Sequence, residues 1–214
     1  MKRIVIISML SLFWIIGSCS KPENKQKSFD ELAEELHVSA EKSIRETQEF
    51  ARSMELELFY EKAPTIAAAA QAELLKNVGV AMKNGGPTNA VGFCNIHASS
   101  IIDSLSNELN ARISRVSDRN RNPQQTATDD EKALMAFFTQ HKKTKDTLIN
   151  ETYYKPIVLG MPTCLKCHGK PLVDINEPTL KVIDERYPHD LAKGYVLGET
   201  RGLWKIEFLS SREK

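Results

Sequence analysis

The residues with the clearest chemistry form the segment Cys164-Leu165-Lys166-Cys167-His168. Two cysteines separated by two residues can each form a thioether with a vinyl group of a haem, and the histidine that follows is placed to bind the iron. The same spacing also occurs in redox disulfides and in half of a zinc site, so these alternatives stay open for the motif alone. The spacing predicts one covalently attached c-type haem. That reading requires export, a second iron ligand and a fold that can bury a porphyrin.

The N-terminal residues predict export. Two basic residues precede a short apolar run over residues 4–16, and small residues follow it. This order is typical of a secretory signal. The tetrapeptide Ile16-Gly17-Ser18-Cys19 resembles a bacterial lipobox, in which the cysteine is acylated and becomes the first residue of the mature chain. We therefore expect a signal peptide over residues 1–18 and a lipid anchor at Cys19. The mature protein would be an extracytoplasmic, membrane-anchored lipoprotein of the periplasm or outer membrane.

An uncleaved membrane anchor is the alternative for this segment, but the apolar run is shorter than the ~20 residues that span a bilayer. The composition is otherwise that of one ordinary globular domain with a helical extension. The chain has 214 residues, with 29 Lys and Arg against 28 Asp and Glu. Near-neutral charge gives no electrostatic reason to expect a nucleic-acid partner.

The cysteine count singles out Cys94. Of four cysteines, one is assigned to lipid and two to the haem motif, which leaves Cys94 unpaired. An unpaired cysteine in an oxidising compartment needs an explanation. Cys94 lies in an apolar pattern with a helical period, so it is predicted to face inward, either as an iron ligand or as a small buried hydrophobic residue.

The chain before the motif is predicted to be mostly helical. Residues 19–27 are polar and indicate a tether, and Ser28 with Glu31 forms a capping box before an amphipathic helix over residues 28–60. The apolar stripe of this helix is expected to pack on the domain, and a homodimer contact through it is the alternative. A second helix is expected from Pro64 to the Gly85-Gly86 pair, and a third helix carries Cys94.

The chain after the third helix predicts a small antiparallel sheet. Residues 112–117 and 153–159 have the pattern of strands, with a helix after residue 128 between them. Residues 194–198 and 203–208 are predicted to form a terminal hairpin. Helices first and a sheet last make an α+β fold, with residues 61–210 as the haem-binding domain.

Five groups compete for the second position on the iron. Cys94 is favoured because iron would lower its pKa and hold it as a thiolate. His97 lies one helical turn further and is the alternative second ligand, although an inward histidine is more often a hydrogen-bonded core residue. Met161 is close to Cys164 in the chain and is predicted to pack at the haem edge. His189 follows a proline and is expected at the surface, which leaves water as the remaining candidate.

Several blocks of the sequence, in order, resemble a family of exported PAS-like domains that bind one c-type haem. The blocks cover roughly residues 59–208 and comprise Cys94, Arg115-Val116-Ser117, Arg121-Asn122-Pro123, the Cys164–His168 motif, Tyr187-Pro188, Asp190, Ala192, Gly194-Tyr195, Gly198 and Arg201-Gly202. The family was long catalogued as a domain of unknown function and occurs alone or in sensor kinases and chemoreceptors. The resemblance implies iron ligation by His168 and Cys94. Residues 124–131 depart from the family pattern, so loop contacts near the haem edge are expected to differ.

Three arginines are predicted to pair with the haem propionates: Arg119, Arg121 and Arg201. Each of them is equally consistent with a solvated side chain or a structural partner of a turn. The sequence therefore predicts a redox or gas sensor that signals through a separate redox or signalling protein partner, with a small monohaem electron carrier as the alternative. A peroxidase-like enzyme would need a distal acid–base group that no clear constellation supplies, so we do not expect an enzyme.

Overall fold

The structure is a computed structural model that describes residues 27–141 and 146–209. The predicted signal peptide, Cys19 and nearly all of the predicted tether lie outside these residues. The chain forms two compact units, one ending at Thr47 and the other beginning at Gln48. The boundary predicted after residue 60 lies inside the second unit. None of the described helices is both long enough and apolar enough to cross a membrane.

Helix α1 (Phe29–Leu109) begins at the predicted capping box. The Ser28 hydroxyl accepts a hydrogen bond from the Glu31 amide, and the Glu31 carboxylate accepts one from the Ser28 amide. Within the second unit, the apolar stripe expected to pack on the domain is exposed at Met54 and Leu58. The residues of α1 that do pack on the domain occupy a different face: Phe59, Ala63, Ile66, Ala67 and Ala70.

The helix predicted to start at Pro64 does not start there, because α1 continues through this residue. A proline inside a helix costs ~3 kcal/mol. Burial on both sides, at Ala63 and Ile66, holds the helical conformation in place. The predicted stop at the next break is confirmed: Gly85 and Gly86 have non-helical backbone angles. Gly86, with φ of 68° and ψ of −165°, adopts a conformation that is almost restricted to glycine.

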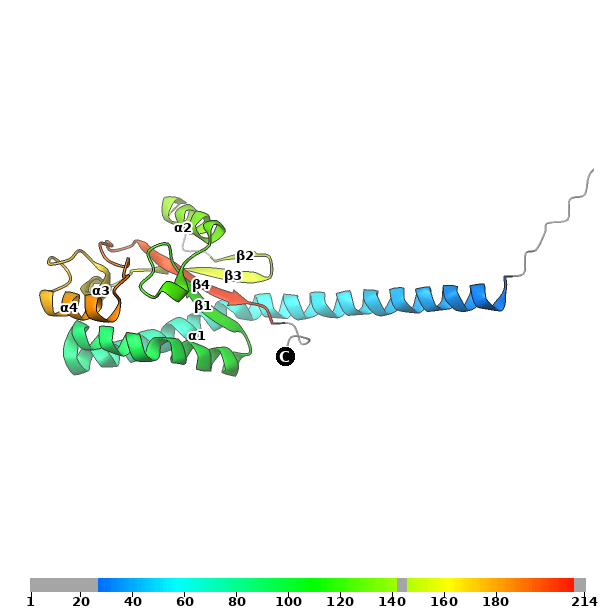
Figure 1. Cartoon of the computed structure of the whole chain (residues 1–214), viewed down its shortest axis with the longest axis horizontal. Coiled ribbons are helices and arrows are strands. Elements are labelled where there is room, and N and C mark those ends of the chain that lie inside the picture. The colour runs from blue at the N-terminus through cyan, green and yellow to red at the C-terminus, as the bar shows by residue number, and fades with distance from the viewer. Residues whose placement is uncertain (1–26, 142–145, 210–214) are drawn as a thin grey trace, which may run out of the picture. The chain divides into compact units, whose positions relative to one another are not determined.

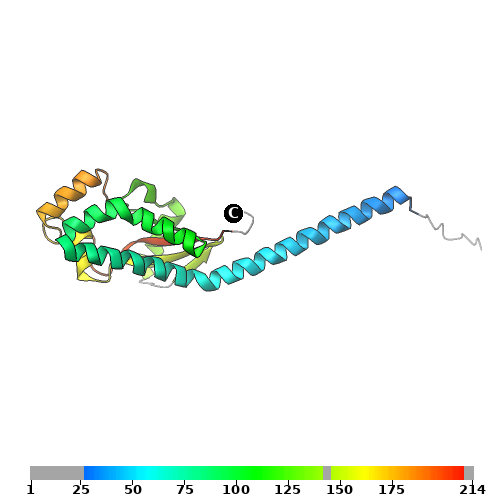
Figure 2. The same ribbon diagram turned by 90° about the horizontal axis from the view of Figure 1, so that it is seen from below.

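The Gly85-Gly86 break makes a helical hairpin of the later part of α1. The Asn89 side chain donates a hydrogen bond of 2.9 Å to the Ala81 carbonyl across the break. Figure 2 shows the helical segments before and after the break lying side by side. The second of them carries Cys94.

One four-stranded antiparallel sheet follows, with the order β1-β4-β3-β2. Its strands are β1 (Arg112–Val116), β2 (Thr147–Ile149), β3 (Thr152–Val158) and β4 (Thr200–Glu207). The strands predicted at 112–117 and 153–159 are confirmed. The prediction of a terminal hairpin is wrong, because β4 pairs with β1 on one side and with β3 on the other. Gly194 and Gly198 have positive φ of 81° and 87° and belong to turns.

The sheet separates two helical layers, as Figure 1 shows, with the α1 hairpin on one face and α2 (Asp129–His141) on the other. Successive side chains of β4 point to opposite faces of the sheet. Trp204 therefore packs with α1, and Leu203 packs with α2. The Glu131 carboxylate of α2 accepts hydrogen bonds from the Thr128 amide, at the start of the helix predicted after residue 128, and from the Tyr154 hydroxyl of β3. These contacts make the predicted α+β fold.

Short elements connect β3 to β4. They are η2 (Pro162–Cys164), α3 (Leu165–His168) and α4 (Glu177–Arg186), while η1 (Pro123–Gln125) follows β1. Asn176 caps α4 by accepting a hydrogen bond from the Thr179 amide. The whole Cys-x-x-Cys-His motif therefore lies on one short helical segment that follows directly from β3 and Gly160.

Candidate cofactor site

A cavity of about 1030 Å³ lies between the α1 hairpin, the ends of β3 and β4, and the motif segment. This volume is at the upper end of the ~300–1,000 Å³ that small-molecule sites occupy. Its walls are mostly apolar, with Leu74, Val91 and Trp204 among them. Cys164, Cys167 and His168 line it from one element, and Cys94 lines it from α1. The fold thus brings together the four residues that the sequence predicted to hold haem.

The motif segment is fixed by backbone contacts to the loop that precedes β4. The Gly194 amide donates to the Gly169 carbonyl at 2.8 Å, and the Tyr195 amide donates to the His168 carbonyl at 2.9 Å. Gly169 itself has no room for a side chain, since a Cβ there would lie 2.5 Å from the Asp174 side chain. These contacts hold the His168 backbone in one position.

The His168 ring presents one nitrogen for coordination. Its Nδ1 lies 3.0 Å from the Ala192 carbonyl oxygen. Because a carbonyl only accepts, Nδ1 carries the proton and Nε2 keeps its lone pair, the arrangement typical of metal-binding histidines. Arg201 Nε is 3.4 Å from the same Nδ1 and cannot donate to it in this tautomer. Burial, with the nearby charges of Arg121 and Arg201, holds the pKa of His168 well below its usual range, so the ring is neutral.

Cys94 faces the cavity as a thiol. It follows Val91 by three residues and precedes Ala98 by four, and both of these residues are buried. Burial raises the pKa of Cys94, while the charges of Arg115 and Arg121 partly offset that rise. Burial likewise raises the pKa of Cys167 to about 11. Cys94, Cys164 and Cys167 are all free of disulfide bonds.

The charged groups on the cavity wall are of one sign. Among the described residues, four arginines line it and no aspartate or glutamate does: Arg115, Arg121, Arg186 and Arg201. Arg115 and Arg201 are partly buried and have no carboxylate partner among the described residues. Burying a cation without a partner is costly, so this part of the wall suits a ligand that brings its own negative charge. A porphyrin with two propionate groups is such a ligand, and its apolar ring suits the rest of the wall.

Arg121, predicted to pair with a propionate, already has a carboxylate partner. Its Nε lies 3.0 Å from Asp190 Oδ1, and the two side chains are only 11% and 1% exposed. Its Nη2 also donates to the Cys167 carbonyl at 2.7 Å. The structure therefore assigns Arg121 a role within the protein, next to the motif, in place of a free propionate-binding group.

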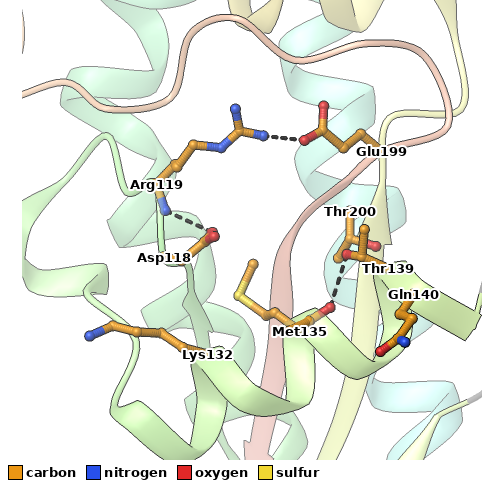
Figure 3. Close-up of a pocket in the computed structure, with 9 residues that line it drawn as sticks. Asp118, Arg119, Lys132, Met135, Thr139, Gln140, Glu199 and Thr200 are labelled. Atoms are coloured by element: carbon orange, nitrogen blue, oxygen red, sulfur yellow. Dashed lines mark hydrogen bonds and ion pairs between the residues drawn. The ribbon is translucent and has the colours of Figure 1, made fainter.

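Arg119, also predicted to pair with a propionate, lies outside the cavity. Its guanidinium pairs with Glu199 and lies 3.4 Å from the centre of the Tyr195 ring. Figure 3 shows this pair at a second hollow, of about 500 Å³, between α2 and the start of β4. Among the other residues that line this hollow, Lys132 pairs with Asp129, and Thr139 donates a hydrogen bond to the Met135 carbonyl. Arg201 alone of the three predicted arginines lines the cavity without a carboxylate partner among the described residues.

The other sequence candidates divide between the cavity and the surface. His97, the alternative ligand, is exposed and stacks on Phe93 with ring centres 5.0 Å apart. Three residues along a helix correspond to a rotation of about 60° from Cys94, which is enough to turn His97 out of the cavity. Met161 and His189 line the cavity and are also exposed, as expected for residues at its edge.

The sequence matches the model of the Tll0287-like family over residues 23–208. The chain belongs to the Tll0287-like family. Membership agrees with the resemblance to a PAS-like family that the sequence blocks suggested. The ligand role of Cys94 and the lipid anchor stay predictions. No curated protein matches the sequence.

A solved structure of the cyanobacterial heme-protein Tll0287 has the same fold. It is 20% identical, with a TM-score of 0.51, and the match covers 69% of this chain and 94% of the other. At this identity the match establishes the fold and not the function. The family model and this structural match point to the same family, and the structure of this Tll0287-like chain shares the fold of that heme-protein.

Two cavity arginines of this Tll0287-like protein, Arg115 and Arg186, were not predicted from the sequence to pair with a propionate. Arg115 lies on β1 and its guanidinium is 5.6 Å from the centre of the Trp204 ring. Its position two residues after buried Ile113 could have revealed it, since alternate strand residues share a face. Arg186 ends α4, and no sequence pattern distinguishes it from a solvated arginine.

Proposed function

We propose that the protein holds one haem in this cavity, attached covalently through Cys164 and Cys167, with His168 as an iron ligand. The observation that carries the proposal is that one mostly apolar cavity gathers the complete attachment motif and a wall of arginines without carboxylates. The Nδ1 contact of His168 supports it, because that contact leaves Nε2 free for a metal. The related cyanobacterial structure is described as that of a heme-protein.

Cys94 is the proposed second iron ligand. It comes from a different element than the motif and lines the same cavity. Burial raises the pKa of its thiol, so Cys94 keeps its proton until a metal ion nearby favours the thiolate. His97 does not compete for this role, because it is exposed on another face of α1.

The propionates are proposed to pair with Arg115, Arg186 and Arg201, in place of Arg119 and Arg121. These three arginines line the cavity and have no carboxylate partner among the described residues. Arg201 is held in position by its Nη1 contact of 2.8 Å to the Ser117 hydroxyl. A fixed guanidinium suits bidentate recognition of a carboxylate.

The proposed role is that of a redox or gas sensor. A bound haem would supply one-electron chemistry and a coordination position for a diatomic gas. Cys94 can hold or release a proton at Sγ, and its helical segment packs on α4 through Val91 and Ile183. Asn95, next to Cys94, donates a hydrogen bond of 3.3 Å to the Arg186 carbonyl. A change at Cys94 would therefore be passed to α4 at the protein surface.

The proposal also covers where the protein is located and which other function the haem could serve. A lipid anchor at Cys19 would keep the domain outside the cytoplasm and next to a membrane, where a sensor would act on a separate partner protein. A small monohaem electron carrier is the alternative function. A carrier would keep both iron ligands in both oxidation states, whereas in a sensor Cys94 would take up a proton at Sγ and leave the iron on reduction.

Carbon monoxide distinguishes the two. We expect the dithionite-reduced protein to bind carbon monoxide with a shift of its absorption bands, because release of Cys94 frees a position on the iron. The measurement is an absorption titration of the reduced protein with the gas. A reduced protein whose spectrum stays unchanged in saturating carbon monoxide would rule out the sensor and favour the carrier.

A further inference from the structure

We propose that Asp190 and Arg121 are positioning residues that hold the Ala192 carbonyl in place and thereby fix the ring of His168. The inference rests on the proposed function, because His168 matters in this way only if it binds iron. It assigns Arg121 a task that differs from propionate binding. It also assigns a task to Asp190, whose carboxylate lies behind the cavity wall.

The contacts form a closed set around one carbonyl oxygen. Ala192 O accepts from His168 Nδ1 at 3.0 Å and from Arg121 Nη2 at 3.3 Å. The amide of the same alanine donates to Asp190 Oδ1 at 2.9 Å. Asp190 thus contacts both the backbone amide of the residue whose carbonyl is the acceptor and the guanidinium that donates to that carbonyl.

The guanidinium also holds the motif itself. Arg121 Nη2 donates to the Cys167 carbonyl at 2.7 Å, one residue before His168. One side chain therefore ties the backbone of the motif to the carbonyl that orients the histidine ring. Rotation of the ring would have to break a contact in this set or move a buried ion pair with it.

Burial makes the set rigid. The Asp190 side chain is 1% exposed and the Arg121 side chain 11%. Other groups near the pair are Lys193, whose Nζ is 3.6 Å from Asp190 Oδ2, and the neutral ring of Tyr187, whose centre lies 5.7 Å from the guanidinium. The charge of Arg201 also acts on both members of the pair. Lys193 lies closer to exposed Asp184, at 2.9 Å, so Arg121 is the nearer of the two cations that pair with Asp190.

A fixed acceptor for Nδ1 strengthens the bond that Nε2 makes to a metal, since it sets the tautomer and the direction of the ring. Loss of such outer contacts commonly weakens metal binding by about 10–100-fold. Here the haem would stay attached through its thioethers. The loss should then appear as a weaker bond between iron and His168 and not as a loss of cofactor.

The test uses the full chain with attached haem and the variants Asp190→Asn and Arg121→Lys. Asp190→Asn removes the charge that holds Arg121, and Arg121→Lys keeps the charge but cannot contact Asp190 and both carbonyls at once. Asp184→Asn is the matched control, because it removes an exposed carboxylate from the same lysine. Asp190→Glu tests rescue by a longer carboxylate.

The readout is the coordination of the iron in the reduced protein saturated with nitric oxide. Nitric oxide weakens the ligand on the opposite side, so a loosely held histidine leaves and the spectrum changes from six-coordinate to five-coordinate. We expect the ratio of five- to six-coordinate complex to rise ~10-fold or more in Asp190→Asn and Arg121→Lys. Asp184→Asn should match the wild type, and Asp190→Glu should lie between.

The outcomes separate the two proposals. A wild-type ratio in both Asp190→Asn and Arg121→Lys would overturn the positioning role and leave the haem proposal standing. Wild-type protein without attached haem would overturn both. Far-UV circular dichroism checks folding first, and if Asp190→Asn does not fold, the Arg121→Lys ratio alone decides.

Discussion

Replacing Cys94 by alanine is expected to raise the midpoint potential of the proposed haem by on the order of 0.1 V, within the ~0.8 V range that axial ligands set. A thiolate donates electron density and favours ferric iron, so its loss favours reduction. The ferric absorption bands should change as well, because a position on the iron opens. A spectroelectrochemical titration of the variant beside the wild type measures both effects.

His97→Ala is the matched control for this prediction. His97 lies one turn further along the same helix but is exposed and stacks on Phe93. Its replacement should leave the potential and the ferric bands at their wild-type values. An unchanged spectrum in Cys94→Ala, or a change in His97→Ala, would move the second ligand to another residue.

Replacing Arg121 by methionine should lower the free energy of unfolding by about 3–5 kcal/mol, because it removes the nearest cation from a buried carboxylate and leaves only Lys193, 3.6 Å away. Asp190 is 1% exposed and Arg121 11%. Arg119→Met offers a close comparison, since Arg119 also pairs with a carboxylate and lies over a ring, but its side chain is 34% exposed. That change should cost only about 1 kcal/mol. Urea denaturation monitored by circular dichroism measures both, and equal losses would show that burial of the pair contributes nothing.

The residues that local patterns could predict were those whose role depends on near neighbours. The Cys164–His168 motif can be recognised without any distant contact. The helical period was enough to predict that Cys94 faces inward. The same reasoning failed for His97, where a rotation of about 60° separates the cavity from solvent. A helical period identifies a face but not its edges, and His97 lies beyond the edge.

The arginines show what the sequence could not reveal. Arg121 and Asp190 are 69 residues apart, and only the loop before β4 brings them together. Arg119 and Arg121 differ by two positions in one polar turn, yet one lies at the second hollow and the other behind the motif. Which arginines remain without a carboxylate, and so suit a propionate, depends on these distant partners.

Contacts between residues far apart in the chain also explain why parts of the fold were predicted wrongly. Residues 194–198 have a strand-like composition, but β4 finds its partners in β1 and β3, far back in the chain. The apolar stripe of the first helix predicted one face of this helix to be buried, but the face that is buried carries Phe59 and Ala63 instead. Periodicity showed that a helix was present and could not show which side the sheet would cover.

The most direct test of the haem proposal is the attachment itself. The full chain should be produced together with a cytochrome c maturation system, beside the double variant Cys164→Ala/Cys167→Ala, and analysed by absorption and by haem staining after denaturation. We predict a wild-type chain that keeps its haem through denaturation and a double variant that carries none covalently. A wild-type chain that emerges without haem, or loses it on denaturation, would contradict the account.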